Sequence, residues 1–241
     1  SRLRCIFVRP SPFASNIDGT AIKQAIYDLF DRLNTGGMNL HPQELRAGVY
    51  PSKFYDLLYE LNENRKWRMD IYGKEHADKH SNDIQILLRV IAFSEQKDNY
   101  SPSMVIFLNN FSWKAQNFSE EKVLEIRTHF NQFLDSYQVS KAEYFPFAAK
   151  TGGNYRVALF DGLYPGWVKN FTETGHAIII NNSILQTIIE KTKKILYGGT
   201  ESNSNGQDGM GKVKGATTDK KNVLARIAIA YSVFSSKNIE Q

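Results

Sequence analysis

Apolar residues recur at helical spacing over most of the chain. Between residues 18 and 33 they fall on one face every three or four positions, and Asp18 precedes them as the expected N-cap. The apolar residues of this face are Ile22, Ile26, Leu29, Phe30 and Leu33. The pattern predicts an amphipathic helix here.

The same reasoning predicts helices along the rest of the chain. Pro42 suits a first helical position and opens a short helix to about Tyr50, and Ser52 caps the next helix through "KFYDLLYELNE". Further helices are expected at 81–95, 103–115, 119–138, 154–170, 183–197 and 220–235. A strand is expected only at 3–9, where the β-formers Ile6, Phe7 and Val8 are consecutive.

These elements predict a mainly α fold, a helical lobe with a short N-terminal β-strand. A single domain over 1–241 is expected, with strand and loop at 1–17, a polar motif region at 18–64 and a helical core at 65–197. Residues 198–218 are rich in Gly, Ser and Asn and are predicted to form a mobile loop. A C-terminal helix at 219–241 completes the domain.

Composition narrows the classes of protein that fit. The 241 residues carry a net charge of +5 with a pI near 9.1, which permits a polyanionic partner without requiring one. Cys5 is the only cysteine, so an internal disulfide and a cysteine-cluster zinc site are excluded. No apolar run is long enough to span a bilayer, and a soluble cytoplasmic protein is expected. Because the chain starts at Ser1 without a Met, it is expected to be the downstream portion of a longer protein.

The polar stretch "FDRLNTGGMNLHPQELRAGVY", residues 30–50, is the leading candidate for chemistry. Two glycines after a helix end permit positive φ and leave backbone N–H groups free to face an anion. Arg32 could pair with phosphate oxygens, and Asn34 offers both a donor and an acceptor. Ordinary helix C-capping, with Glu44 and Arg46 supporting the bend, explains the same residues. The residues alone leave both interpretations open.

The stretch resembles the signature of the GmrSD-type restriction-system N-terminal domain family, which acts against modified phage DNA. The matching signature residues are Phe30, Arg32, Leu33, Asn34, Thr35, Gly36, Gly37, Leu40, Gln43, Glu44, Leu45 and Arg46. Three later segments are similar to further parts of the family: "SNDIQILLRVIAF" with Asp83 and Arg89, "ALFDGLY", and "TTDKKNVLARI". The family's Asp-Gly-Gln-Gln-Arg motif, tied to nucleotide hydrolysis, and its HNH nuclease motif are absent from this sequence.

The resemblance implies that the fold is the helical remainder of a ParB-like α+β module. It implies an antiphage function that couples nucleotide binding or hydrolysis to sensing of modified DNA, with an NTP and Mg²⁺ bound by the complete protein. The implied partners are modified phage DNA and a nuclease domain or subunit, without a membrane. The implied phosphate-binding residues are Arg32, Asn34, Thr35, Gly36, Gly37, Gln43, Glu44 and Arg46. A non-catalytic DNA-binding or protein-interaction module is the alternative.

Three other groups of residues are candidates for DNA binding, metal binding or base stacking. The densest basic region suits either phosphate-backbone contact or a solvated face, and it comprises Lys191, Lys193, Lys194, Lys212, Lys214, Lys220 and Lys221. The DNA-binding candidates are all of these except Lys191. His76 and His80 lack a third metal ligand at a fixed spacing, so a polar linker is expected there rather than a metal site, and His41 is expected near a helix N-cap. Core packing is expected to explain Trp67, Trp113 and Trp167 better than base stacking.

Overall fold

The structure is a computed structural model that describes residues 19–33, 40–101, 103–140, 157–197 and 218–238. The described residues form α-helices joined by short connections, with no β-strand among them beyond one isolated parallel bridge, Tyr137 to Ile180. The first helices are α1 (Gly19–Leu33), α2 (Pro42–Val49), α3 (Lys53–Asn62), the π-helix η2 (Trp67–Tyr72), α4 (Asn82–Gln96) and the 3-10 turn η3 (Lys97–Asn99). They are followed by α5 (Met104–Ala115), α6 (Glu120–Ser136), α7 (Val157–Thr174), α8 (Asn182–Tyr197) and α9 (Lys220–Asn238).

The mainly α class predicted from the apolar spacing is therefore confirmed for the described residues. The predicted strand at 3–9, the Asp18 cap and nearly all of the predicted loop at 198–218 lie outside them. Two short elements were missed, because no helix was predicted at Trp67–Tyr72 or at Lys97–Asn99. None of the described helices has the length and apolar character needed to cross a bilayer.

Polar caps fix where several helices begin. The hydroxyls of Ser52, Ser103 and Ser119 accept hydrogen bonds from backbone N–H groups at the starts of α3, α5 and α6. Such caps satisfy donors that the first helical turn leaves without partners. At α2, His41 is the N-cap and Pro42 takes the first turn, where its missing N–H costs nothing. The predicted helix starts at Pro42 and after Ser52 are confirmed.

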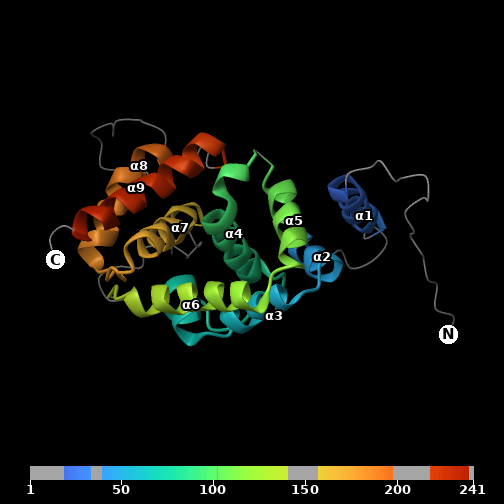
Figure 1. The fold of residues 1–241 in the computed structure, drawn as a ribbon, viewed down its shortest axis with the longest axis horizontal. Coiled ribbons are helices and arrows are strands. Elements are labelled where there is room, and N and C mark those ends of the chain that lie inside the picture. The colour runs from blue at the N-terminus through green and yellow to red at the C-terminus, as the bar shows by residue number, and fades with distance from the viewer. Residues whose placement is uncertain (1–18, 34–39, 102, 141–156, 198–217, 239–241) are drawn as a thin grey trace, which may run out of the picture.

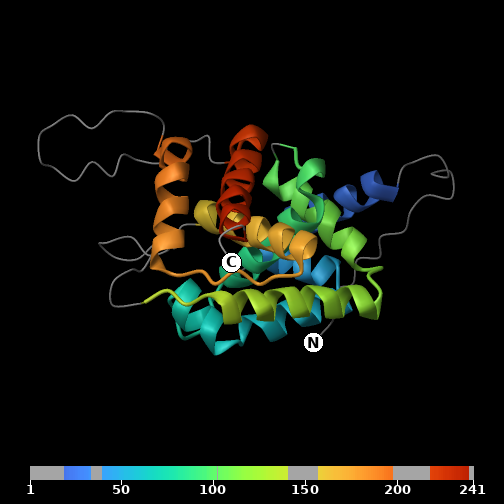
Figure 2. The same cartoon turned by 60° about the vertical axis from the view of Figure 1, so that its left-hand side comes forward.

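Helix α7 lies at the centre of the larger group of helices, where it contacts α4, α6, α8 and α9 (Figure 1). Helix α1 lies at the end of the molecule that is opposite to α8 and α9, where it contacts α2 and α5 (Figure 1). Turning the molecule shows α6 running lengthwise along its lower side, next to α3 (Figure 2). The helices that flank the signature thus lie at one end, away from α8 and α9.

Aromatic side chains fill the centre of the core. Trp67 and Trp167 are fully buried, and Trp113 is half-buried, as core packing predicts. The Trp67 indole N–H donates to Asn62 at 3.0 Å and that of Trp167 donates to the Ile178 carbonyl at 3.0 Å. Buried indoles usually need such partners, so these two tryptophans fix neighbouring segments as well as fill space.

Candidate functional site

The structure describes the two flanks of the signature but not its central loop. Asn34, Thr35, Gly36 and Gly37 lie outside the described residues, so their predicted roles stay predictions. Arg32 lies exposed near the end of α1 and takes part in a polar interaction. The second flank is α2, which carries the remaining candidates, and it contacts α1, α4 and α5.

Two of these candidates, Gln43 and Arg46, are buried in the core. Each is only 1% exposed. Their spacing of three positions places them on one face of α2, which is turned toward α5. Arg46 Nε donates to Asn109 Oδ1 of α5 at 2.9 Å, and Arg46 Nη1 donates to Gln43 Oε1 at 2.5 Å.

No carboxylate pairs with Arg46 among the described residues. Both of its hydrogen-bond acceptors, on Gln43 and Asn109, are neutral amide oxygens. Burial lowers the pKa of the Arg46 guanidinium, and only tyrosines, first Tyr55 and then Tyr27 and Tyr50, oppose that shift. A buried cation without a counter-charge is costly, and strongly perturbed buried charges are concentrated at functional sites.

The Gln43 amide nitrogen is a second buried donor beside Arg46. Gln43 Nε2 is buried and has no acceptor at good hydrogen-bond geometry among the described residues, although the Gln43 side chain lies close enough to the Tyr55 hydroxyl to oppose the rise in the pKa of Tyr55. That hydroxyl is bonded instead to Ser112 Oγ at 3.1 Å. Buried donors are nearly always paired, so the Gln43 amide and the Arg46 guanidinium together form a spot suited to an anionic acceptor. We call Gln43, Arg46 and Asn109 the α2 donor cluster.

Glu44 faces a different way from its neighbours. Its Oε2 accepts a hydrogen bond from the His41 backbone N–H at 2.6 Å, which closes one half of a capping box at the start of α2. A carboxylate there also favours the positive end of the helix dipole. The arrangement gives Glu44 a role in fixing the start of the helix that carries the donor cluster.

A separate buried network surrounds Arg68, and here every charge is paired. Arg68 Nη1 donates to Asp83 Oδ2 at 3.1 Å and to Asn62 Oδ1 at 3.1 Å, and its other nitrogens donate to the Glu75 and His76 carbonyls. Asp83 also accepts from Asn62 Nδ2 at 2.9 Å. The network joins α3, η2 and the start of α4, so Asp83 has a structural partner.

The three later segments that resemble the family meet in the core. Arg89 of α4 forms a two-pronged pair with Asp161 of α7, with Nε to Oδ1 at 2.7 Å and Nη2 to Oδ2 at 2.5 Å. Arg226 of α9 lies 3.9 Å from the same carboxylate. Burial raises the pKa of the Asp161 carboxyl, and the Arg89 guanidinium opposes the rise. Segments more than 60 positions apart therefore share one buried ion cluster, which ties α4, α7 and α9 together.

The predicted DNA-binding lysines are only partly described. Lys212 and Lys214 lie outside the described residues, and Lys193 and Lys194 belong to α8 without described side chains. Lys221 is exposed, whereas Lys220 Nζ donates to the Asp98 carbonyl at 2.7 Å. That bond joins the start of α9 to η3, which gives Lys220 a structural contact.

Within the described part of the chain, no three His, Cys, Asp or Glu side chains come together as metal ligands. Residues 73–80 form a non-helical linker, as predicted for the segment containing His76 and His80. His80 instead stacks on His41, with ring centroids 3.8 Å apart and planes inclined by 18°. The structure therefore brings His80 to the start of α2.

Sequence reasoning missed several residues that surround the α2 donor cluster. Asn109, Tyr55 and Ser112 come from α3 and α5, and His80 comes from the linker before α4. One signal was present: Asn109 interrupts the nearly continuous apolar run of "MVIFLNNFSW". A buried amide in an apolar helix requires a partner, which here is Arg46.

A scan against protein-family models and searches of curated proteins and solved structures found no match to this chain.

Proposed function

We propose that this chain is the helical part of an antiphage restriction module that couples nucleotide binding to the sensing of modified DNA. In this proposal the α2 donor cluster binds a phosphoryl group of the nucleotide. The resemblance of residues 30–46 to the GmrSD-type signature supplies the functional class. The single observation that carries the phosphate site is the buried Arg46 cation, whose described acceptors are all neutral.

The chemistry of the cluster suits phosphate. A phosphoryl oxygen would accept from Gln43 Nε2, for which the described residues offer no acceptor at good geometry, and would place negative charge beside Arg46. Glycines at 36 and 37 precede the cluster and would add backbone donors of the kind found at phosphate sites. Mg²⁺ bound with the nucleotide would neutralise part of the phosphate charge.

The depth of the cluster favours a terminal phosphoryl group. Gln43 and Arg46 are each 1% exposed, and they are enclosed by Asn109 of α5 and Tyr55 of α3. A terminal phosphate carries one substituent, whereas a DNA backbone phosphate carries two and would need a channel open at both ends. We therefore propose a free nucleotide, rather than the phosphate backbone of DNA, as the ligand of the cluster.

Titration calorimetry with inorganic triphosphate and with nucleoside triphosphates tests the proposal. Arg46→Met should weaken triphosphate binding by at least about tenfold, because a charge-assisted bond in a desolvated site contributes roughly 1.5–3 kcal/mol. Gln43→Leu should weaken it less, because that change removes a neutral donor. Arg65→Met removes an exposed arginine and serves as the matched control, with binding unchanged.

Unchanged triphosphate affinity in both Arg46→Met and Gln43→Leu would refute the phosphate site. Duplex DNA forms the second arm of the experiment. Salt-sensitive DNA binding without any triphosphate binding would favour the alternative of a non-catalytic DNA-binding module.

A further inference from the structure

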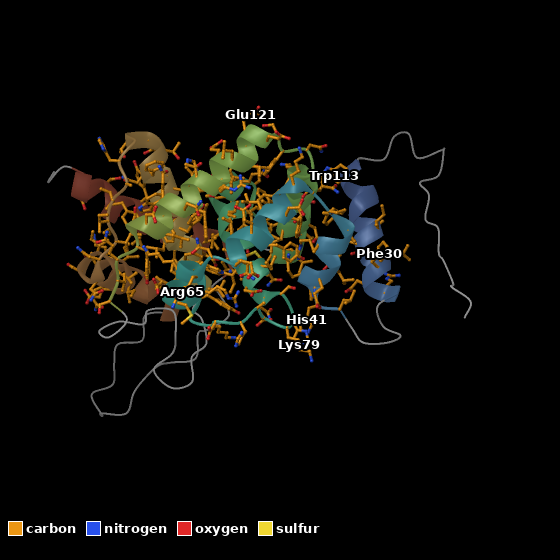
Figure 3. All side chains as sticks on the ribbon, turned by 90° about the horizontal axis from the view of Figure 1, so that it is seen from below. Phe30, His41, Arg65, Lys79, Trp113 and Glu121 are labelled. Carbon is orange, nitrogen blue, oxygen red and sulfur yellow. The ribbon has the colours of Figure 1, made fainter. Side chains whose placement is uncertain are left out.

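The stack between His41 and His80 joins two distant parts of the chain at the start of α2. The centroid separation of 3.8 Å and inclination of 18° describe nearly parallel rings in contact. Both side chains are only half-buried, so the stack lies near the surface (Figure 3, where His41 and Lys79 mark this edge). A contact near the surface contributes little to the stability of the core. Because this stack lies beside the start of α2, its effect is on the position of that helix.

His41 is the residue through which the signature loop enters α2. Its carbonyl accepts the first helical hydrogen bond, from Leu45 N at 3.0 Å, and its N–H donates to Glu44. Helix α2 has only eight residues, and a helix of this length depends on tertiary contacts. A displacement of His41 would therefore move Gln43, which lies two positions further on.

The linker that carries His80 is held rigidly from the other side. Asp78 Oδ1 accepts from the His80 backbone N–H at 2.9 Å, and the Asp78 N–H donates to Asp83 Oδ2 at 2.9 Å. Arg68 donates to the carbonyls of Glu75 and His76. The linker is thus anchored to the fully paired network around Asp83.

The residue after His80 has an unusual backbone conformation. Ser81 has φ 55° and ψ 29°, and it is the described non-glycine residue with positive φ. Left-handed backbone at such a residue is strained and persists only where the surroundings enforce it. This strained turn lies directly between the stacked ring of His80 and the first turn of α4.

From this geometry we propose that His80 is a positioning residue for the α2 donor cluster. Its ring holds His41, and with it the start of α2, against the linker anchored at Asp83. Gln43 and Arg46 are thereby kept in register for an anion. The inference rests on the proposed function, since it assigns a means of positioning to the same site.

The test compares three variants of the full chain, with sulfate as the probe in titration calorimetry. His80→Ala removes the stack and should weaken sulfate binding by about tenfold, because small misplacements of binding groups are costly. His80→Phe keeps a flat ring and should restore affinity to within about twofold of the unmodified chain. His76→Ala alters an exposed histidine of the same linker and should bind sulfate normally.

Amide hydrogen exchange without sulfate provides a second, independent measurement. The Leu45 amide, bonded to the His41 carbonyl, should exchange faster in His80→Ala but not in His80→Phe, with global stability nearly unchanged in both. Equal sulfate affinity and equal Leu45 exchange in His80→Ala and the unmodified chain would overturn the inference. If the unmodified chain binds no sulfate, the phosphate site fails, and Leu45 exchange alone decides whether His80 positions α2.

Discussion

Two buried arginines differ in the partners that the fold gives them. Arg68 faces the Asp83 carboxylate at 3.1 Å, whereas the acceptors of Arg46 among the described residues are the neutral amides of Gln43 and Asn109. Removing one member of a buried ion pair lowers the stability of the fold, because the remaining charge is left in a medium that solvates it poorly. Removing a buried cation whose acceptors are neutral leaves no unpaired charge in the core. The two positions should therefore respond differently to the same substitution.

Urea denaturation of Arg46→Met and Arg68→Met checks this difference. Arg68→Met should lose about 3–5 kcal/mol of unfolding free energy, because it leaves the Asp83 carboxylate buried without its cation. Arg46→Met should stay within about 1 kcal/mol, because relief of cation desolvation offsets the donors lost to Gln43 and Asn109. Comparable losses in both variants would show that Arg46 is a structural residue with a partner of equal strength.

The buried Tyr55 hydroxyl leads to a prediction about stability in alkaline solution. Burial raises the pKa of Tyr55 to about 12, against the opposing effect of Arg46, while the unfolded chain titrates near 10. Because the folded-state pKa is raised, the stabilising contribution is complete below pH 10 and is lost as the pH rises to about 12. The loss amounts to roughly 2–3 kcal/mol. Denaturation at several pH values should show this extra decline in the unmodified chain and not in Tyr55→Phe.

Helices α7 and α9 pack unusually closely because α7 presents glycine toward α9. A Cβ at Gly162 would lie 2.8 Å from Arg226 Cβ, and one at Gly166 would lie 2.7 Å from Ala230 Cβ and 2.9 Å from the Tyr231 backbone nitrogen. These neighbours are backbone and Cβ atoms, which cannot rotate away. Helix α2 offers the opposite case, since a Cβ at Gly48 would meet nothing within 4 Å.

Alanine substitutions compare the two environments. Gly162→Ala and Gly166→Ala should each cost about 1–3 kcal/mol of unfolding free energy through overpacking. Gly48→Ala, at an exposed helical position, should instead raise it by up to about 1 kcal/mol. Thermal or urea unfolding measures all three. Stabilisation by Gly162→Ala would contradict the close contact between α7 and α9.

At the scale of the whole molecule, one carboxylate connects three helices. Asp161 of α7 pairs with Arg89 of α4 and lies near Arg226 of α9. A pair of similar geometry lies on the surface, where Arg127 donates to Glu60 at 2.8 and 2.7 Å. Surface ion pairs contribute little to folding stability because water screens them. The loss of stability on removing each carboxylate should therefore depend on how deeply it is buried.

Neutralising each carboxylate measures that difference. Asp161→Asn should cost about 3–5 kcal/mol, because the buried Arg226 and the partly buried Arg89 lose their common carboxylate. Glu60→Gln should cost less than about 1 kcal/mol. Arg89→Gln should fall between them, because Arg226 still lies beside Asp161. Denaturant unfolding of the three variants gives the order, and a reversed order of Asp161 and Glu60 would refute the role given to the cluster.

Local sequence patterns account for most of the described helices and for several of their starts. Apolar spacing predicted every α-helix in that part of the chain, and Pro42 and Ser52 marked where α2 and α3 begin. These features depend on residues within about one helical turn of one another, and such neighbours are visible in the sequence. The π-helix at Trp67–Tyr72 was missed, because its geometry accompanies long-range bonds made by Arg68.

The hydrogen-bond and packing partners of the candidate residues follow from the tertiary structure and not from the local sequence. The motif marked Gln43, Glu44 and Arg46 together, yet Glu44 caps its own helix while the other two lie buried against Asn109. Likewise, nothing in the local sequence joins His80 to His41. The energy of a charged or polar group depends on burial and on partners that arrive from distant segments. Packing between distant segments therefore determines which partner each polar residue of the motif has.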